Sequence, residues 1–251
     1  MAEHIMRAEY WPAALAGNPT LPAGLVKRLA TDADPKVRLH VSARPELPEE
    51  QRAAIDWTVG PEDRLGTLDW VWEAREVPDV LRRCATSAHV WLRRSAAVCP
   101  GLPADMVELL AGDEDFAVRL LLAEYHPEPP AELLLDLYLH GTHRAVGMLV
   151  TRPAFPTTGL APRFADAPDP RARALALRDP DATAELVDRL SHDPENEVRA
   201  AAARDPRLPV PRIRELLAEP GTAYSAAANP ALPVADMLGL LERAGVPQEQ
   251  P

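Results

Sequence analysis

The sequence has little of what marks secreted or membrane-spanning proteins. Only two of its 251 residues are cysteine, Cys84 and Cys99, which is too few for a disulfide framework and indicates a reducing compartment. No uncharged apolar run approaches the roughly 20 residues that a bilayer requires, and the strongest candidate, residues 133–139, is interrupted by an aspartate. Glu3 and Arg7 stand where a secretory signal would need an apolar stretch. These absences predict a cytoplasmic location and no membrane partner.

An excess of positive charge is also absent. The formal net charge at pH 7 is −11; residues 1–125 carry 14 Lys and Arg against 20 Asp and Glu, and residues 126–251 carry 13 against 18. Neither half is basic, whereas a phosphate-binding surface usually appears as a basic domain or stripe. Nucleic acid is therefore a disfavoured partner.

Motifs that accompany catalysis or cofactor binding are missing as well. The sequence contains no P-loop and no GxGxxG, GxSxG or HExxH pattern. His126, His140 and His143 lie near one another, but no nearby cysteine or well-spaced carboxylate completes a tetrahedral metal site, so we expect loop histidines. Cys84 and Cys99 form no CxxC pair and are expected to be buried small hydrophobic residues. We predict a protein that is not an enzyme and that holds no metal or cofactor.

Proline is abundant and periodic. It accounts for 28 of the 251 residues, about twice the usual share of roughly 5 %. One proline recurs every 24 to 27 residues, with a single gap of 55 that the segment AREVPDVLRRCATS (74–87) fills as a unit without its proline. These anchor prolines are Pro19, Pro45, Pro100, Pro127, Pro153, Pro180, Pro206 and Pro230. The spacing predicts about nine repeats of about 26 residues.

Each repeat is predicted to contain two short helices. The first follows a Leu-Pro pair and carries leucines three or four positions apart, as at Leu25 and Leu29. The second begins at an acidic N-cap, with proline at the first helical position in Asp34-Pro35, and ends before the anchor proline. A single pair of helices is too small to bury a core, so stacking must supply the stability.

These patterns predict an all-α fold, an α-solenoid in a single repeat domain over residues 1–251. Within it we expect an N-terminal cap at 1–10, repeats over 11–245 and a disordered tail at 246–251. The repeats are irregular at 49–90 and at 154–168, where two prolines interrupt the first helix.

The pattern A-x-NP-x-LP, then L-x-x-L, then D-x-D-P-x-V-R resembles the leucine-rich repeat variant family and is similar to HEAT-like repeats. The resemblance covers about residues 11–245. It implies alternating α and 3-10 helices in a right-handed superhelix, so some second helices are expected to be 3-10. A founding-type member carries an iron–sulfur cluster in a cysteine-rich N-terminal segment. This chain has no cysteine before Cys84, so that cofactor is not carried over.

An arginine recurs seven residues before the anchor proline, or eight in one repeat. The arginines are Arg38, Arg93, Arg119, Arg173 and Arg199. All except Arg93 have an acid four positions earlier, and these acids are Asp34, Asp115, Asp169 and Glu195. One interpretation is a basic stripe for phosphates or an acidic peptide. Because the acid accompanies the arginine and cancels its field, we favour a structural acid–arginine ladder between or within layers.

Four of the five tryptophans lie in residues 57–91, close to a group of arginines. This segment predicts a partner-binding patch, because tryptophan is enriched at binding hot spots; the alternative is that bulky rings fill gaps in a decayed repeat. The candidate residues are Trp57, Trp70, Trp72, Arg82, Arg83, Trp91 and Arg94. Trp70 and Trp72 cannot share a helix face, so we expect one of them at the surface.

The function predicted from the sequence is a non-catalytic scaffold that binds a protein or peptide, as a monomer or weak homodimer. Solenoids generally offer extended binding surfaces. Two alternatives stay open. The first is a nucleic-acid-binding HEAT-like protein similar to DNA repair glycosylases. The second is an accessory protein to a metalloenzyme, suggested by the family resemblance.

Overall fold

A computed structural model describes residues 11–60 and 65–246 of the chain, and all regular elements in these ranges are helices. The predicted all-α class is confirmed. The predicted N-terminal cap and all but the first residue of the predicted tail lie outside the described residues. In the first part of the chain the helices are α1 (Trp11–Ala16), α2 (Ala23–Leu29), α3 (Pro35–Ser42), α4 (Glu49–Ala53), α5 (Asp69–Glu73), α6 (Pro78–Ala85), α7 (Val90–Ala97), α8 (Ala104–Ala111), α9 (Phe116–Tyr125), α10 (Ala131–His140) and the 3-10 helix η2 (Arg144–Thr151).

The chain divides into two compact units, Met1–Phe155 and Pro156–Pro251, which we call the first and second unit. Their boundary falls inside the irregular stretch expected at 154–168; a single repeat domain stays a prediction. The helices of the second unit are α11 (Leu160–Phe164), α12 (Pro170–Ala176), α13 (Ala184–Leu190), α14 (Asn196–Ala203), α15 (Val210–Leu217), α16 (Ala223–Ala227) and α17 (Val234–Arg243).

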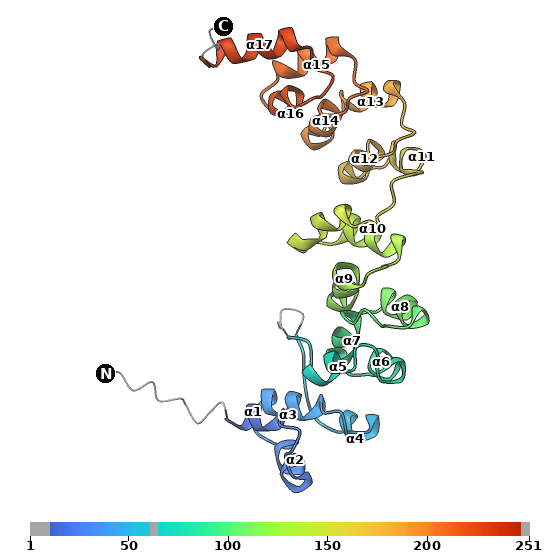
Figure 1. Ribbon diagram of the computed structural model, residues 1–251, viewed down its shortest axis with the longest axis vertical. Helices are drawn as coiled ribbons and strands as arrows, with labels where there is room; N and C mark the ends of the chain where they lie inside the picture. The colour runs from blue at the N-terminus through green and yellow to red at the C-terminus, as the bar shows by residue number, and fades with distance from the viewer. Residues whose placement is uncertain (1–10, 61–64, 247–251) are drawn as a thin grey trace, which may run out of the picture. The chain divides into compact units, whose positions relative to one another are not determined.

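Within each unit, two kinds of helix alternate along the chain (Figure 1). The first helices, which follow the Leu-Pro pairs or their equivalents, are α2, α4, α6, α8 and α10, then α11, α13, α15 and α17. The second helices are α1, α3, α5, α7, α9 and η2, then α12, α14 and α16. Second helices pack on second helices, as α5 on α7, α7 on α9 and α12 on α14. We call a first helix and the second helix that follows it a layer.

Local sequence chemistry sets the ends of these helices. Asp34 caps α3 by accepting a hydrogen bond from the Lys36 amide, and Pro35 occupies the first helical position. Helix α10 ends at His140, immediately before Gly141. The expectation of 3-10 helices is confirmed for one second helix, η2.

Each layer contributes fully buried aliphatic side chains to the packing. Leu81, Leu110 and Leu134 come from the first helices α6, α8 and α10, and Val118 comes from the second helix α9. None of them is more than 1 % exposed. Because helices of 5 to 10 residues are not stable alone, these contacts supply most of the stability.

Polar side chains near the anchor prolines link successive layers. Arg44 donates to the carbonyls of Ala16 and Asn18 at 2.7 and 2.8 Å, and Asn229 donates to those of Ala203 and Asp205 at 2.8 Å. The partners lie 24 to 28 residues apart in the sequence, which is one period. The last carbonyls of a helix have no partner within it. The next layer supplies that partner.

The layers approach so closely at Gly101 that no side chain fits there. A Cβ at this position would overlap the carbonyl oxygen of Arg75, at the end of the preceding layer. We expect Gly101→Ala to lower the free energy of unfolding by about 1–3 kcal/mol, because the layers must separate or strain. Urea unfolding followed by circular dichroism measures this change.

Gly24→Ala is the matched control. Position 24 lies inside α2, and an added Cβ would meet no atom within 4 Å. Alanine there should stabilise the protein by up to about 1 kcal/mol, since glycine is a poor helix former. Equal effects of the two substitutions would contradict the close approach of layers at Gly101.

None of the helices in the described ranges has the length and apolar character needed to cross a membrane.

Candidate functional site

The residues predicted to form one aromatic and basic patch lie in several different environments. Trp91 and Arg94 are 6 % and 5 % exposed, and Arg94 pairs with Asp115 at 2.8 Å. Trp72 is the exposed member of the predicted Trp70–Trp72 pair, at 46 %. It follows that the seven residues do not make one surface patch.

The other members of the predicted patch also have separate surroundings. Trp57 stacks on His89 with ring centroids 4.0 Å apart. Arg82 pairs with Asp105 of the next layer. Trp70 and Arg83 line cavities between the layers.

A groove of about 710 Å³ lies along the second helices of the first unit. It is lined by α1, α3, α5 and α7 and by the segment 66–68 that precedes α5. Its lining residues are Ala13, Ala14, Gly17, Asn18, Pro19, His40, Ala43, Arg44, Pro45, Gly66, Thr67, Leu68, Asp69, Trp70, Glu73 and Trp91. We call it the α5 groove.

Three aromatic rings in the α5 groove are held by contacts within the protein. The Trp70 indole donates to the carbonyl of Ala43 at 3.1 Å, and the Trp91 indole donates to that of Gly66 at 2.7 Å. His40 meets Trp91 edge to face, with centroids 5.1 Å apart. Because both indole N–H groups are already bonded, neither is free for a ligand, and the partly exposed Trp70 offers the groove its apolar surface.

The titratable and charged side chains that line the groove differ in whether they are available to a ligand. Arg44 is 4 % exposed and bound to two carbonyls and Glu46. Burial lowers the pKa of the His40 imidazole, so this ring is neutral at neutral pH. Asp69 and Glu73, on α5, are exposed. The net charge available to a ligand is therefore negative.

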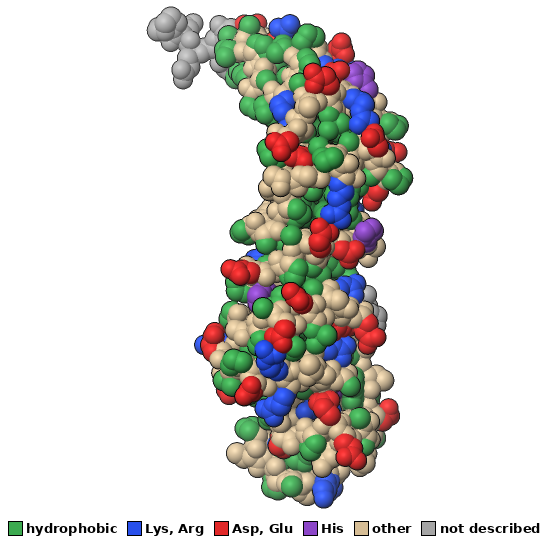
Figure 2. Space-filling view, turned by 90° about the vertical axis from the view of Figure 1, so that its right-hand side faces the viewer, with side chains coloured by type: hydrophobic (Ala, Val, Ile, Leu, Met, Phe, Trp, Pro, Cys, Tyr) green, Lys and Arg blue, Asp and Glu red, His purple; other side chains and the backbone are tan. Residues whose placement is uncertain are grey.

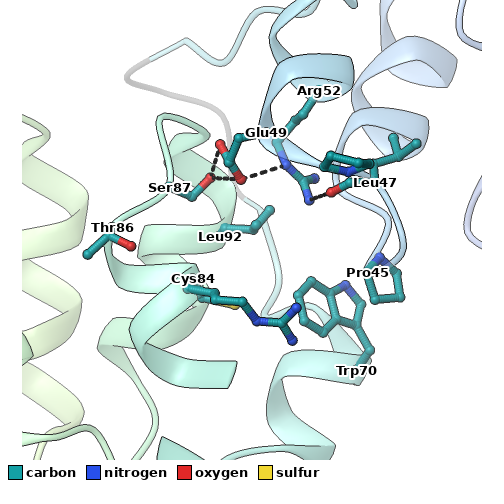
Figure 3. A pocket seen from close by; sticks show the side chains of 11 residues that line it. Pro45, Leu47, Glu49, Arg52, Trp70, Cys84, Thr86, Ser87 and Leu92 are labelled. Atoms are coloured by element: carbon teal, nitrogen blue, oxygen red, sulfur yellow. Dashed lines mark hydrogen bonds and ion pairs between the residues drawn. The ribbon is translucent and has the colours of Figure 1, made fainter. Parts of the chain in front are cut away.

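A smaller cavity of about 210 Å³ adjoins the groove and shares Pro45 and Trp70 with it (Figure 3). The Glu49 carboxylate accepts hydrogen bonds from the Ser87 hydroxyl at 2.9 Å and from Arg52 at 3.1 Å. Arg52, 4 % exposed, also donates to three carbonyls near the end of α3. This network joins three successive layers, and most of its polar atoms are paired within the protein.

The recurring arginines are committed to the protein itself. One terminal nitrogen of each donates to two carbonyls five and six residues earlier, in the loop before its own helix. The pairs are Asp32 and Ala33 for Arg38, Ser87 and Ala88 for Arg93, Asp113 and Glu114 for Arg119, Ala167 and Pro168 for Arg173, and Asp193 and Pro194 for Arg199. These bonds fix the loop between the two helices of a layer.

Four of these arginines pair with an acid that follows them in the sequence and not with one four positions earlier. Arg93 pairs with Asp113 at 2.7 Å and Arg173 with Asp193 at 2.7 Å, each twenty residues later and in the next layer. Arg38 and Arg199 pair with Asp56 and Glu219, which also follow them in the sequence.

The guanidinium groups that form these pairs are only partly exposed, at 12 to 25 %. In Figure 2, acidic and basic side chains are interspersed over the face in view. Both observations weigh against a basic stripe for phosphates.

The acid four residues before the arginine caps the helix instead. Asp34, Asp115 and Asp169 each accept a hydrogen bond from a backbone amide of the first turn, whereas Glu195 occupies the N-cap of α14 without such a bond. His89 takes the same place before Arg93 and accepts from the Trp91 amide. The backbone amides at the start of a helix have no partner within it, and this explains the recurring acids better than charge pairing with the arginines does.

A double-mutant cycle on Arg173 and Asp193 tests the link between layers. We expect Arg173→Gln and Asp193→Asn to be coupled by about 1.5–3 kcal/mol, because a charged pair with little exposure is broken. The exposed pair Arg189–Asp166, with side chains 53 % and 83 % exposed, is the control; it should show at most about 1 kcal/mol. Equal coupling energies would contradict a structural role for the interlayer pair.

The buried pair Ser42 and His89 is not a catalytic dyad. The Ser42 Oγ lies 2.8 Å from His89 Nε2, and both residues are fully buried. His89 Nδ1 accepts the Trp91 amide, so Nε2 carries the proton and donates to Ser42, whose hydroxyl donates to the Leu39 carbonyl. A ring with a protonated Nε2 cannot take a proton from the serine, so this chain of bonds joins α3 to α7.

The described residues show no reactive thiol and no group of metal ligands. Burial raises the pKa of the Cys84 thiol to about 12 and that of Cys99 to about 11, so both stay protonated at neutral pH. In residues 11–60 and 65–246, no three His, Cys, Asp or Glu side chains are grouped so that they could hold a metal ion.

Some residues of the α5 groove were not predicted from the sequence. His40 carries no local signal, because its place beside Trp91 depends on two helices about fifty residues apart. Asp69 and Glu73 had a signal, since they flank Trp70 at a spacing of four, which places both on one face of a helix.

Comparisons with family models, with curated proteins and with solved structures found no match to this chain.

Proposed function

We propose that this protein is a helical-repeat module that binds an extended peptide segment of a partner protein in the α5 groove. In this proposal the chain is a right-handed α-solenoid of about nine repeats, of the leucine-rich repeat variant type. The hydrogen bonds that recur one period apart between layers support this arrangement. In this proposal the ligand of the groove is a segment of another protein and not a substrate that reacts there.

The observation that carries the proposal is the groove itself. Its volume of about 710 Å³ lies in the range of about 300–1,000 Å³ that is typical of ligand sites. Aromatic side chains line it, and aromatic anchors dominate the energetics of binding surfaces.

A peptide-display selection on the full chain tests this function. Random heptapeptides that bind should be enriched, and the enriched peptides should bind Trp70→Ala at least tenfold more weakly, because the substitution removes the wall shared by both cavities. Fluorescence anisotropy measures the affinities.

Trp72→Ala is the matched control, since Trp72 lies on the same helix, is exposed and does not line the groove. It should leave the affinity unchanged. The absence of any enriched peptide, or equal binding to wild type and Trp70→Ala, would refute the proposal.

A further inference from the structure

We infer that the α5 groove selects a peptide segment with a lysine or arginine side chain, which lies between Trp70 and the carboxylates of α5. This inference rests on the proposed function and names the chemistry of the partner. It depends on the charges, the aromatic surface and the free-energy cost of the acidic pair.

The charges favour a cation. Asp69 and Glu73 are one helical turn apart on α5 and both line the groove. The described residues show no ion pair for either carboxylate, whereas Asp113 and Asp193 at the interlayer contacts are paired with arginines. An anionic segment would meet two uncompensated negative charges.

The aromatic surface favours the same ligand. Trp70 is partly exposed and lines the groove together with the two carboxylates, whereas Trp91 beside it is largely buried. A Lys or Arg side chain can lay its aliphatic stem on an indole ring while its charged end meets a carboxylate. A neutral apolar segment would use the rings alone, and an acidic one neither feature.

Glu73 is in an unfavourable place in the free protein, whereas Asp69 lies in the first turn of α5, where the helix dipole favours a negative charge. Like charges four residues apart on a helix repel. Glu73 is also the last residue of α5, where the helix dipole disfavours a negative charge. A bound cation would relieve both effects.

The test uses the full chain and three pools of the peptide Ac-Ala-X-X-Z-X-X-Ala-NH2, with X an equal mixture of uncharged amino acids. Position Z is lysine, norleucine or glutamate. We expect the lysine pool to bind at least tenfold more tightly than the norleucine pool, and the glutamate pool to bind most weakly. Added salt should reduce the preference for lysine, because the carboxylates are exposed.

Two variants locate the effect. Glu73→Gln should weaken binding of the lysine pool several-fold, leave binding of the norleucine pool unchanged and slightly raise the melting temperature of the free protein. Glu50→Gln changes an exposed residue of α4 that lines neither cavity, and it should leave binding of all pools unchanged.

The experiment distinguishes failure of the selection for a cation from failure of the proposed peptide binding. If lysine and norleucine pools bind equally and both lose affinity in Trp70→Ala, the peptide groove stands and the selection for a cation is overturned. Tighter binding of the glutamate pool overturns it as well. If no pool binds, the proposed function itself fails, and this inference with it.

Discussion

Replacement of Leu110 by alanine is expected to lower the free energy of unfolding by about 2–5 kcal/mol, one of the two largest effects that the structure predicts. Leu110 is fully buried on α8, which packs against α6, α7 and α9. The shorter side chain would leave a cavity where helices of successive layers meet. Chemical denaturation of the full chain, with circular dichroism as the signal, measures the loss.

The neighbouring leucine provides the control. Leu109 lies on the same helix and is 48 % exposed. Leu109→Ala keeps helix propensity and should cost less than about 1 kcal/mol. If both substitutions had the same small effect, the layers would not be stabilised by the packing described above.

The second large effect is the pH dependence caused by His89. Burial, with a contribution from Arg52, lowers the pKa of His89 to about 3 in the folded protein, whereas an exposed histidine has a pKa of about 6.5. Above pH 6.5 the ring is neutral in both states, and its full contribution to stability is present. Between pH 6.5 and 3 the unfolded chain takes up a proton that the folded chain refuses. Stability therefore falls by up to about 1.4 kcal/mol per pH unit as the pH is lowered.

His89→Asn isolates this contribution. Asparagine can still accept the Trp91 amide bond as an N-cap, but it does not titrate. We expect urea unfolding at several pH values between 6.5 and 4.5 to show a smaller slope of stability against pH for the variant, whatever its absolute stability. Equal slopes for wild type and variant would show that His89 is not held neutral in the fold.

Local chemistry explains how much of the fold was predictable. Helix starts at Asp34-Pro35 and Asp169-Pro170 follow from N-capping and the fixed φ of proline, which act within a few residues. The same periodic prolines placed the helix ends. The all-α class needed no more than this.

Contacts between layers were harder to predict. The carboxylate that pairs with Arg173 is Asp193, twenty residues away, whereas the sequence pattern suggests Asp169, the N-cap four residues earlier. Asp169 is used by the helix start, since its carboxylate accepts the Arg171 amide. The choice depends on which group is nearer in space, which a local pattern does not encode.

The tryptophans and arginines of the predicted patch do not form one surface, for a similar reason. Composition showed that tryptophan and arginine are interleaved over residues 57–94, but burial separates them. Trp91 and Arg94 serve packing, Trp72 is exposed, and Trp70 divides two cavities. The different environments of these side chains result from tertiary packing, which composition does not show.

The most direct test of the binding claim is fluorine NMR of the full chain labelled with 5-fluorotryptophan, before and after addition of the lysine peptide pool. Substitution of each tryptophan by phenylalanine assigns the five resonances. The resonances of Trp70 and Trp91 should shift on binding, and those of Trp57 and Trp72, which do not line the groove, should stay in place. A shift of Trp57 or Trp72 with Trp70 and Trp91 unmoved would contradict binding in the α5 groove.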